Sequence, residues 1–320
     1  MPRHPLHHAR IRLNAALMQR VAGPDPASIQ HRIHRTPGPR WFTPDSPIGV
    51  VHGDTSMYIG GIRALLLQAL HPLAMAGVAQ HSRYREDVWG RLARTATYIA
   101  TTTYATIEDA EQAIAIVQAV HRRILGTAPD GRPYRADDPH LLTWVHIAEI
   151  DSFLTAHTLF GRRQLTRAEQ DEYVAQAGSV ATRLGAADVP TSRAELTAAL
   201  ARYRPELTGS QEAREVAEFL LHRPPVPAPA RHGYGLLALA ATASLPAWGR
   251  TMLGLPADVP TLPARLAGRL GTSALRWIST PPALDPPTTN PPDDGASVDR
   301  ARTVNEALTT DTTPATQEHR

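Results

Sequence analysis

Apolar side chains recur at spacings of three and four through most of the chain, and this period is that of one face of an α-helix. Alternating apolar and polar runs, which are typical of half-buried strands, are almost absent. The spacing predicts helices over residues 61–81, 87–105, 107–126, 138–160, 166–185, 192–203, 210–222, 233–253 and 259–277. We therefore expect an all-α fold, with a single multi-helix bundle that spans residues 44–278.

Signals for helix starts support these boundaries. Asp138 precedes Pro139, which places an N-cap before a first-turn proline. Three further pairs have the spacing of a capping box, namely Thr166 with Glu169, Ser192 with Glu195 and Thr208 with Gln211.

The two ends of the chain differ from this bundle in composition. Residues 1–43 form a basic arm with a single acid before residue 40, Asp25. We expect a solvated arm that packs one short helix on the core; the alternative is a helix on a membrane surface. The histidines of the arm, His4, His7 and His8, are expected to be solvated. Residues 279–320 are rich in proline and threonine with little to bury, which predicts a disordered tail.

The residue types that are missing exclude several kinds of chemistry. The chain has no cysteine and no lysine, so thiolate ligands, iron–sulfur clusters and Schiff-base lysines are excluded. Its net charge of +3 comes from arginines interspersed with acids, which argues against a nucleic-acid groove. No uncharged apolar run reaches the ~18 residues of a membrane span, and the start lacks the apolar part of a signal peptide. A cytoplasmic protein is expected.

The predicted helix 107–126 carries a histidine on its apolar face. Ile114, Val117, Val120 and Ile124 place His121 on the inward stripe. A buried imidazole must be hydrogen-bonded or bound to a metal, because an unpaired buried polar group costs about 1–3 kcal/mol. The spacing leaves both roles open, a satisfied core histidine and a metal ligand.

The predicted helix 138–160 repeats this feature. His146 and Glu149 are one turn apart, so an imidazole and a carboxylate share one face. This arrangement is compatible with a non-haem metal site. The alternative is that Glu149 only orients His146.

Polar groups also interrupt the nearly aliphatic segment 61–81. Proline at position 72 removes a backbone hydrogen bond and kinks or divides the helix. Gln68, His71, Gln80 and His81 are the polar groups that this buried element carries at its bend and end.

Arg91, Arg94 and Thr95 share one face of the helix predicted over residues 87–105, because they are three and four residues apart. Guanidinium groups beside an apolar pocket suit bidentate pairing with carboxylates, including haem propionates. An exposed basic helix face is the alternative.

Several ordered motifs within residues 45–255 resemble those of the latex-clearing rubber oxygenase and MpaB-type oxygenase family. They are Arg63-Ala-Leu-Leu-Leu-Gln-Ala-Leu-His71-Pro72, Gly77-Val-Ala-Gln80-His81-Ser82, Arg91-Leu-Ala-Arg94-Thr95, Val120-His121-Arg-Arg-Ile-Leu-Gly126, Tyr134-Arg-Ala-Asp-Asp-Pro139, Leu142-Thr-Trp144-Val-His146 and Leu245-Pro-Ala-Trp248. The resemblance implies a globin-like helical core around b-type haem, with dioxygen as co-substrate and a hydrophobic small molecule such as an isoprenoid as substrate.

The same resemblance assigns roles to residues. His121 matches the proximal haem ligand, and Arg91, Arg94 and Thr95 match an Arg-x-x-Lys-Thr distal segment. Arg94 stands where the rubber enzymes have lysine, and an always-charged arginine is a poor iron ligand. No carboxylate lies between residues 67 and 82 to match the glutamate base of those enzymes. Gln80, His81 and His71 are the groups that could replace it.

The sequence therefore predicts a haem b-dependent oxygenase in which His121 holds the iron. Arg91 and Thr95 are expected to hydrogen-bond a propionate or the distal ligand, and Arg94 to polarise dioxygen.

Two alternatives stay open at this point. One is a non-haem iron site built from His71, His81, His146 and Glu149. The other is a non-catalytic helical protein that binds haem or lipid, since membership of a family does not by itself determine activity.

Overall fold

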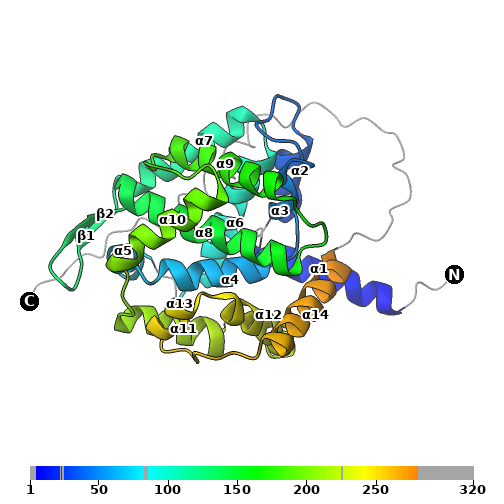
Figure 1. The fold of residues 1–320 in the computed structure, drawn as a ribbon. Coiled ribbons are helices and arrows are strands. Elements are labelled where there is room, and N and C mark those ends of the chain that lie inside the picture. Colours follow the sequence, from blue (N-terminus) through cyan, green and yellow to red (C-terminus); the bar gives the residue numbers. More distant parts are fainter. Residues whose placement is uncertain (1–4, 22, 24, 83–85, 225, 280–320) are drawn as a thin grey trace, which may run out of the picture.

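A computed structural model describes residues 5–279 except residues 22, 24, 83–85 and 225, so the predicted tail from residue 280 onward lies outside the described residues. Helices make up most of the described chain, which confirms the all-α prediction (Figure 1). The α-helices are α1 (Pro5–Val21), α2 (Pro26–Arg35), α3 (Pro47–His52), α4 (Met57–Gln68), α5 (Pro72–His81), α6 (Val88–Tyr104), α7 (Ile107–His121), α8 (Pro139–Phe160), α9 (Arg167–Leu184), α10 (Arg193–Tyr203), α11 (Gln211–His222), α12 (Arg231–Ser244), α13 (Ala247–Met252) and α14 (Thr261–Ser279). Two 3₁₀ helices, η1 (Arg204–Glu206) and η2 (Ala228–Ala230), and two strands, β1 (Leu125–Thr127) and β2 (Pro133–Arg135), complete the fold.

The pair of α4 and α8 forms the centre of the bundle (Figure 1). Leu66, Leu67 and Trp144 are fully buried in the core that both helices share. Gly60 allows a close approach, because a Cβ at this position would lie 3.1 Å from the Cα of Phe153. The helices α9 and α10 pack on α8, and α11 to α14 form a layer on the other side of α4 (Figure 1).

Residues 61–81 form two helices rather than one. α4 ends at Gln68, α5 begins at Pro72, and the two axes meet at 104°. Pro72 occupies the first turn of α5, where its missing N–H leaves no hydrogen bond unmade, and His71 before it is extended. In the described part of the chain, no single helix has the length and hydropathy to cross a membrane, and the bent pair α4 and α5 passes that test only when taken together.

The predicted helix 107–126 is too long by its last turn. α7 ends at His121, and the chain then forms β1, which pairs antiparallel with β2. The end of α5 holds this hairpin: Gln80 Nε2 donates to the carbonyl of Thr127 (2.9 Å), and the Tyr134 hydroxyl donates to Gln80 Oε1 (2.7 Å). Tertiary contacts with α5 thus override the helical pattern after His121.

Most of the predicted helix starts are confirmed. Thr166 and Glu169 form a capping box, and Asp138 and Ser192 cap α8 and α10. The prediction for Thr208 is wrong, because Ser210 caps α11 instead. The N–H of Thr208 donates to the carbonyl of Leu70 (2.8 Å), which ties this loop to the bend between α4 and α5.

The basic N-terminal arm contains two helices, where the sequence predicted one. α2 packs on α6 and buries Ile29, and Arg32 forms a 2.7 Å ion pair with Asp109 at the start of α7. α1 contacts α6 and α14, where Asn14 Nδ2 donates to the carbonyl of Ile278 (3.0 Å). Both described helices of the arm are therefore packed on the bundle.

Candidate functional site

One side of α8 carries ligand-type residues. Leu142, Val145, His146 and Glu149 share this side by helical spacing. Burial lowers the pKa of His146 to about 4 and raises the pKa of Glu149 to about 7. Both side chains are deeply enclosed but keep some accessible surface, so they border space that neighbouring side chains do not fill. At neutral pH the imidazole is uncharged and the carboxyl group is close to its midpoint of ionisation.

α4 presents apolar surface next to this side of α8. Gln68 Nε2 donates to the carbonyl of Val145 (3.1 Å), and Leu65 and Gly61 precede Gln68 on the same face of α4. Leu65 and Val145 are 38% and 37% exposed, although their chain neighbours Leu66 and Trp144 are fully buried. A Cβ at Gly61 would meet no atom within 4 Å. We refer to Gly61, Leu65 and Val145 as the open face.

α6 adds a tyrosine to this region. The hydroxyl of Tyr98 is buried and has no hydrogen-bond partner among the described residues. Burial, and to a lesser degree the charge of Glu149, raise the pKa of Tyr98 well above its usual range. Tyr98 therefore stays protonated and lies within electrostatic reach of Glu149. His146 Nε2 is likewise buried without a partner in the described structure. Buried polar groups in folded proteins are nearly always paired, so these two point to a bound group that supplies the partner.

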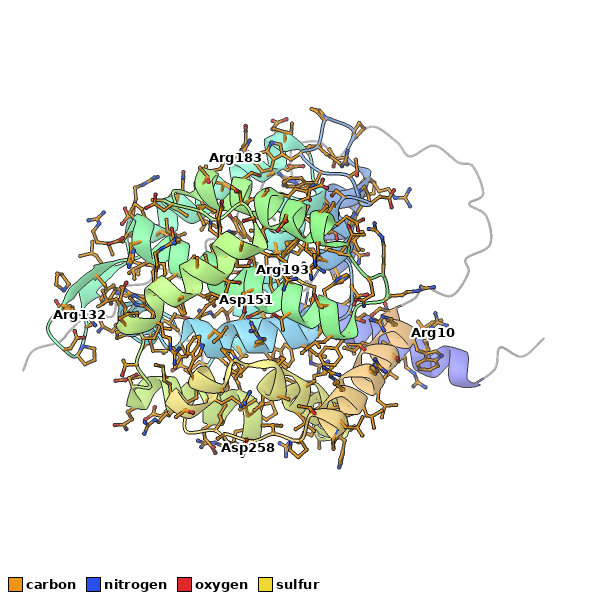
Figure 2. All side chains as sticks on the ribbon, in the orientation of Figure 1. Arg10, Arg132, Asp151, Arg183, Arg193 and Asp258 are labelled. Atoms are coloured by element: carbon orange, nitrogen blue, oxygen red, sulfur yellow. The ribbon has the colours of Figure 1, made fainter. Side chains whose placement is uncertain are left out.

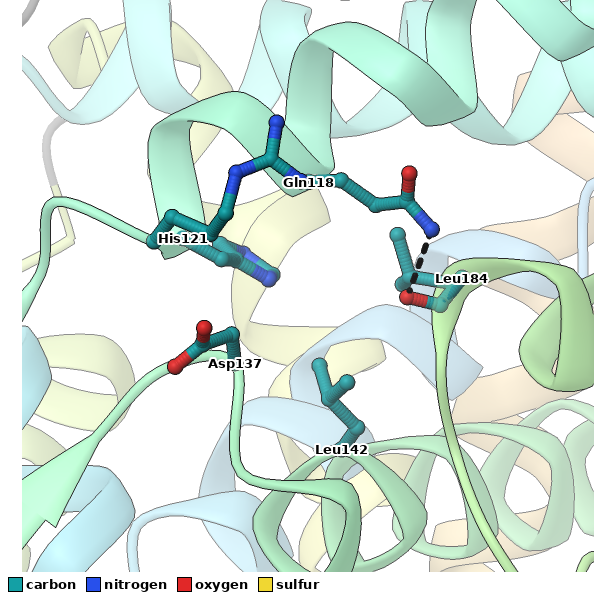
Figure 3. Close-up of a pocket in the computed structure, with 6 residues that line it drawn as sticks. Gln118, His121, Asp137, Leu142 and Leu184 are labelled. Atoms are coloured by element: carbon teal, nitrogen blue, oxygen red, sulfur yellow. Dashed lines mark hydrogen bonds between the residues drawn. The ribbon is translucent and has the colours of Figure 1, made fainter.

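His121, the last residue of α7, points into a pocket between α7 and the start of α8 (Figure 3). The pocket has a volume of about 160 Å³ and is lined by Gln118, His121, Arg122, Asp137, Leu142 and Leu184. Nδ1 of His121 is buried and unpartnered among the described residues. Burial lowers the pKa of His121, and the nearby carboxylate of Asp137 opposes this shift only in part. The ring is therefore a neutral imidazole, which is the form that binds metals.

The His121 pocket adjoins the polar side of α8. Leu142 lines the pocket and lies one turn before His146 on the same side of the helix. The pocket by itself is smaller than the roughly 300–1,000 Å³ of typical small-molecule sites. Any larger ligand of His121 must therefore extend beyond this pocket.

The predicted distal residues lie near the start of α6. Nη1 of Arg91 donates to Ser82 Oγ (3.0 Å), and Nη1 of Arg94 forms a 3.2 Å ion pair with Asp87, the N-cap of α6. Thr95 is exposed. Arg91 therefore contacts the end of α5, and Arg94 has its charge balanced by Asp87 at the start of its own helix.

The alternative iron site does not assemble. The sequence combined His71, His81, His146 and Glu149 in that site. In the described part of the chain, the one group of three ligand-type residues whose ligand atoms lie within 4.8 Å of one another is His71, His140 and Glu206. His81 is exposed, and its Nε2 lies 3.1 Å from the carbonyl of Leu125 in the hairpin. The sharp bend before Pro72 directs His71 and His81 to different neighbours.

Sequence reasoning missed Tyr98, His140 and Glu206. Tyr98 could have been found from its spacing of four after Arg94, which places both on one side of α6. His140 lies in the first turn of α8 and Glu206 at the end of η1. No periodic pattern marks these two positions, because their proximity to His71 depends on how three distant segments pack.

Comparison with known proteins identifies the family. The sequence model described as ER-bound oxygenase mpaB/B'/Rubber oxygenase, catalytic domain, matches residues 50–277. No curated protein sequence and no solved structure is significantly similar to the chain. The matched range includes the open face, the polar side of α8 and His121. Since it covers well over half of the 320 residues, the chain belongs to the mpaB/B' and rubber oxygenase family and carries that family's oxygenase catalytic domain.

Proposed function

We propose that this protein is a haem b-dependent oxygenase that acts on a hydrophobic small molecule such as an isoprenoid. Membership of the family supports the oxygenase class. The observation that carries the haem proposal is the buried, unpartnered Nδ1 of His121, which adjoins a side of α8 where apolar and polar surface is left open.

The donor chemistry of these residues fits haem. His121 offers a neutral imidazole, which is the usual proximal ligand of haem iron in oxygen-binding proteins. Arg91 and Thr95 are the groups that would bind the propionates, through charge-assisted and hydroxyl hydrogen bonds. When bound, haem supplies the iron centre at which dioxygen is activated.

The open face would bind the apolar part of the substrate. Leu65 and Val145 present uncovered aliphatic surface, and the missing side chain of Gly61 leaves space beside them. Each methylene group that the substrate buries there contributes about 0.8 kcal/mol to binding. The open face would therefore select substrates by their hydrophobicity and shape.

Glu149 would act as the proton acceptor near this face. A general base works best when its pKa is close to the operating pH, and burial raises the pKa of Glu149 to about 7. The phenol of Tyr98 remains protonated within electrostatic reach of Glu149 and is able to donate a hydrogen bond. In this assignment the base is a carboxylate on α8, since no carboxylate lies between residues 67 and 82 to take that role. Arg94, paired with Asp87, would act through its charge and not as an iron ligand.

Absorption spectroscopy tests the proposal. The protein is produced with a haem supply, and spectra are recorded in the oxidised, reduced and carbon monoxide-treated forms. We expect a Soret band in the wild type that is lost or strongly shifted in His121→Ala and kept in His146→Ala. His222→Ala, which changes an exposed histidine on α11, is the matched control.

The outcomes are distinct. A wild type without porphyrin absorbance contradicts haem dependence. If the band is lost in His146→Ala and kept in His121→Ala, the iron ligand is His146 on α8 and not His121 on α7. Dioxygen uptake on addition of an isoprenoid alkene then distinguishes an oxygenase from a haem carrier, which would show the band without turnover.

A further inference from the structure

Three segments far apart in the sequence bring ligand-type side chains together on the surface of the bundle beside the bend between α4 and α5. His71 is the N-cap of α5, His140 lies in the first turn of α8, and Glu206 ends η1. Nε2 of His140 lies 2.9 Å from Oε2 of Glu206, and Nε2 of His71 lies 3.5 Å from the same oxygen. One nitrogen from each ring and one carboxylate oxygen all fall within 4.8 Å of one another.

The hydrogen bonds of Tyr203 determine which nitrogen of His140 faces the carboxylate as an acceptor. The hydroxyl of Tyr203 donates a hydrogen bond to the carbonyl of His140 (2.8 Å). The hydroxyl oxygen then accepts from Nδ1 of His140 (3.0 Å). With a proton on Nδ1, His140 turns the lone pair of Nε2 toward the oxygens of Glu206. Two acceptors this close repel each other unless a cation lies between them.

His71 faces the same carboxylate from the buried side of the cluster. Its side chain is only 1% exposed, and neither ring nitrogen has a hydrogen-bond partner in the described structure. At 3.5 Å, the separation of Nε2 from Glu206 exceeds the length of a good hydrogen bond. A buried imidazole whose nitrogens have no partner is able to offer a lone pair to a metal ion.

The surrounding structure holds these three groups in place. The N–H of Thr208 donates to the carbonyl of Leu70 (2.8 Å), which fixes the segment of Glu206 against the segment of His71. Trp144 packs against His71, with ring centroids 6.1 Å apart, and its Nε1 donates to the carbonyl of Gln68 (3.2 Å). Metal sites depend on such supporting contacts to orient their ligands.

We propose that His71 Nε2, His140 Nε2 and a carboxylate oxygen of Glu206 bind one divalent transition-metal ion of the Zn²⁺ class. Two imidazoles and one carboxylate are a known zinc ligand set, and a water completes the coordination from the solvent side, where His140 and Glu206 are 54% and 37% exposed. Bonds of about 2.0–2.2 Å to a tetrahedral ion require ligand atoms roughly 3.3–3.6 Å apart. The separation of 3.5 Å between His71 Nε2 and Glu206 Oε2 lies in this range, and the 2.9 Å between His140 Nε2 and the same oxygen would widen on binding.

This ion would link the bend between α4 and α5, the start of α8 and η1. The inference does not depend on haem or on the oxygenase proposal, because none of its ligands is a proposed haem ligand. The same geometry has a rival explanation, in which a proton lies between His140 Nε2 and Glu206 in place of the metal. His140 and Glu206 would then be a surface ion pair, and His71 would have no partner.

Calorimetric titration with ZnCl₂ distinguishes the two. The full chain is first treated with a chelator, and His4, His7 and His8 are replaced by alanine so that the histidines of the arm do not bind the ion. We expect one equivalent of Zn²⁺ per chain and a rise in Tm on its addition. His140→Ala and Glu206→Gln should each weaken binding by more than about 100-fold, since even supporting residues around a metal contribute about 10–100-fold. Tyr203→Phe, which removes such a support, should fall within that range.

The chain offers a matched control. His222 and Glu218 on α11 are an exposed pair 4.0 Å apart that could also attract the ion, so His222→Ala and Glu218→Gln should leave both the affinity and the stoichiometry unchanged. Far-UV circular dichroism checks that each variant is folded. The absence of saturable binding, or wild-type affinity in both His140→Ala and Glu206→Gln, overturns the proposal and favours the ion pair. We expect His140→Ala to lose zinc binding and to keep its Soret band, so failure of the zinc proposal can be distinguished from failure of the haem proposal.

Discussion

Nη1 of Arg63 lies 2.7 Å from the carboxylate of Asp151, and this ion pair joins α4 to α8. Asp151 lies near the middle of the molecule (Figure 2). Arg63 is only 4% exposed. It also donates to Ser152 Oγ (2.7 Å) and to the carbonyl of Ser244 (3.1 Å). The arginine that begins the first family-like motif thus connects three helices, α4, α8 and α12.

The two partners of this pair should differ in their effect on stability. Asp151→Asn leaves a buried guanidinium without its counter-charge, which should lower the free energy of unfolding by about 3–5 kcal/mol. Arg63→Met should cost less, because the carboxylate that it leaves behind is 23% exposed to water. Urea unfolding of both variants and of the double variant measures this, and the double variant should recover part of the loss. An Asp151→Asn variant that is more stable than Arg63→Met contradicts the asymmetry.

Two adjacent glycines in α4 provide a matched test of the packing. A Cβ at Gly60 would lie 2.8 Å from a ring carbon of Phe153, so Gly60→Ala should destabilise the fold by about 1–3 kcal/mol. Gly61→Ala meets no atom within 4 Å and should stabilise α4 by up to about 1 kcal/mol through helix propensity. Thermal unfolding compares the two variants directly. Equal destabilisation by both would show that Gly61 does not border open space.

The pH dependence of stability should reveal Glu149. Its pKa is raised from 4.5 to about 7 in the folded state, so between these values the unfolded chain ionises while the folded chain stays protonated. Stability through this group therefore falls as pH rises from about 4.5 to 7 and is then constant. Glu149→Gln should be more stable than the wild type by on the order of 3 kcal/mol at pH 8 and equal to it at pH 4. Urea midpoints across this range test the difference, and a gain at pH 4 as large as at pH 8 would contradict it.

The same substitution should affect turnover separately from haem binding. If Glu149 accepts a proton during the reaction, Glu149→Gln should lower the rate of dioxygen consumption by about 10²–10⁴-fold while the Soret band is kept. Glu218→Gln is the control for an exposed glutamate. The rate of the wild type should rise with pH through about 7 as the carboxylate forms. Wild-type turnover in Glu149→Gln would exclude the proposed base.

The hairpin should depend on Gln80. Tyr134 is 4% exposed as a residue, and Gln80→Ala leaves its hydroxyl without the acceptor that Gln80 provides, which costs about 1–3 kcal/mol locally. Amide exchange over residues 124–136 should therefore become roughly tenfold faster or more, with little change in α9. Gln211→Ala, on the exposed face of α11, should change neither region. Unchanged exchange in the hairpin would mean that Gln80 does not hold it.

The sequence alone was sufficient where a helical period extends over many consecutive positions. The helical period predicted an all-α bundle, because a period of 3.6 residues is visible in the order of apolar residues along the chain. The same period placed His146 and Glu149 on one side of one helix, and the ordered motifs pointed to the family. The end of α7 at His121 was missed, because its cause is the contact of Gln80 with a hairpin formed later in the chain.

Only the tertiary structure decided which of these residues meet. His71 lies beside His140 and Glu206 because the proline bend, the start of α8 and η1 pack together, and the intervening residues carry no pattern that records it. The burial that shifts the pKa of Glu149 depends in the same way on surroundings in space. Periodicity is a property of the chain, whereas desolvation and proximity are properties of its packing.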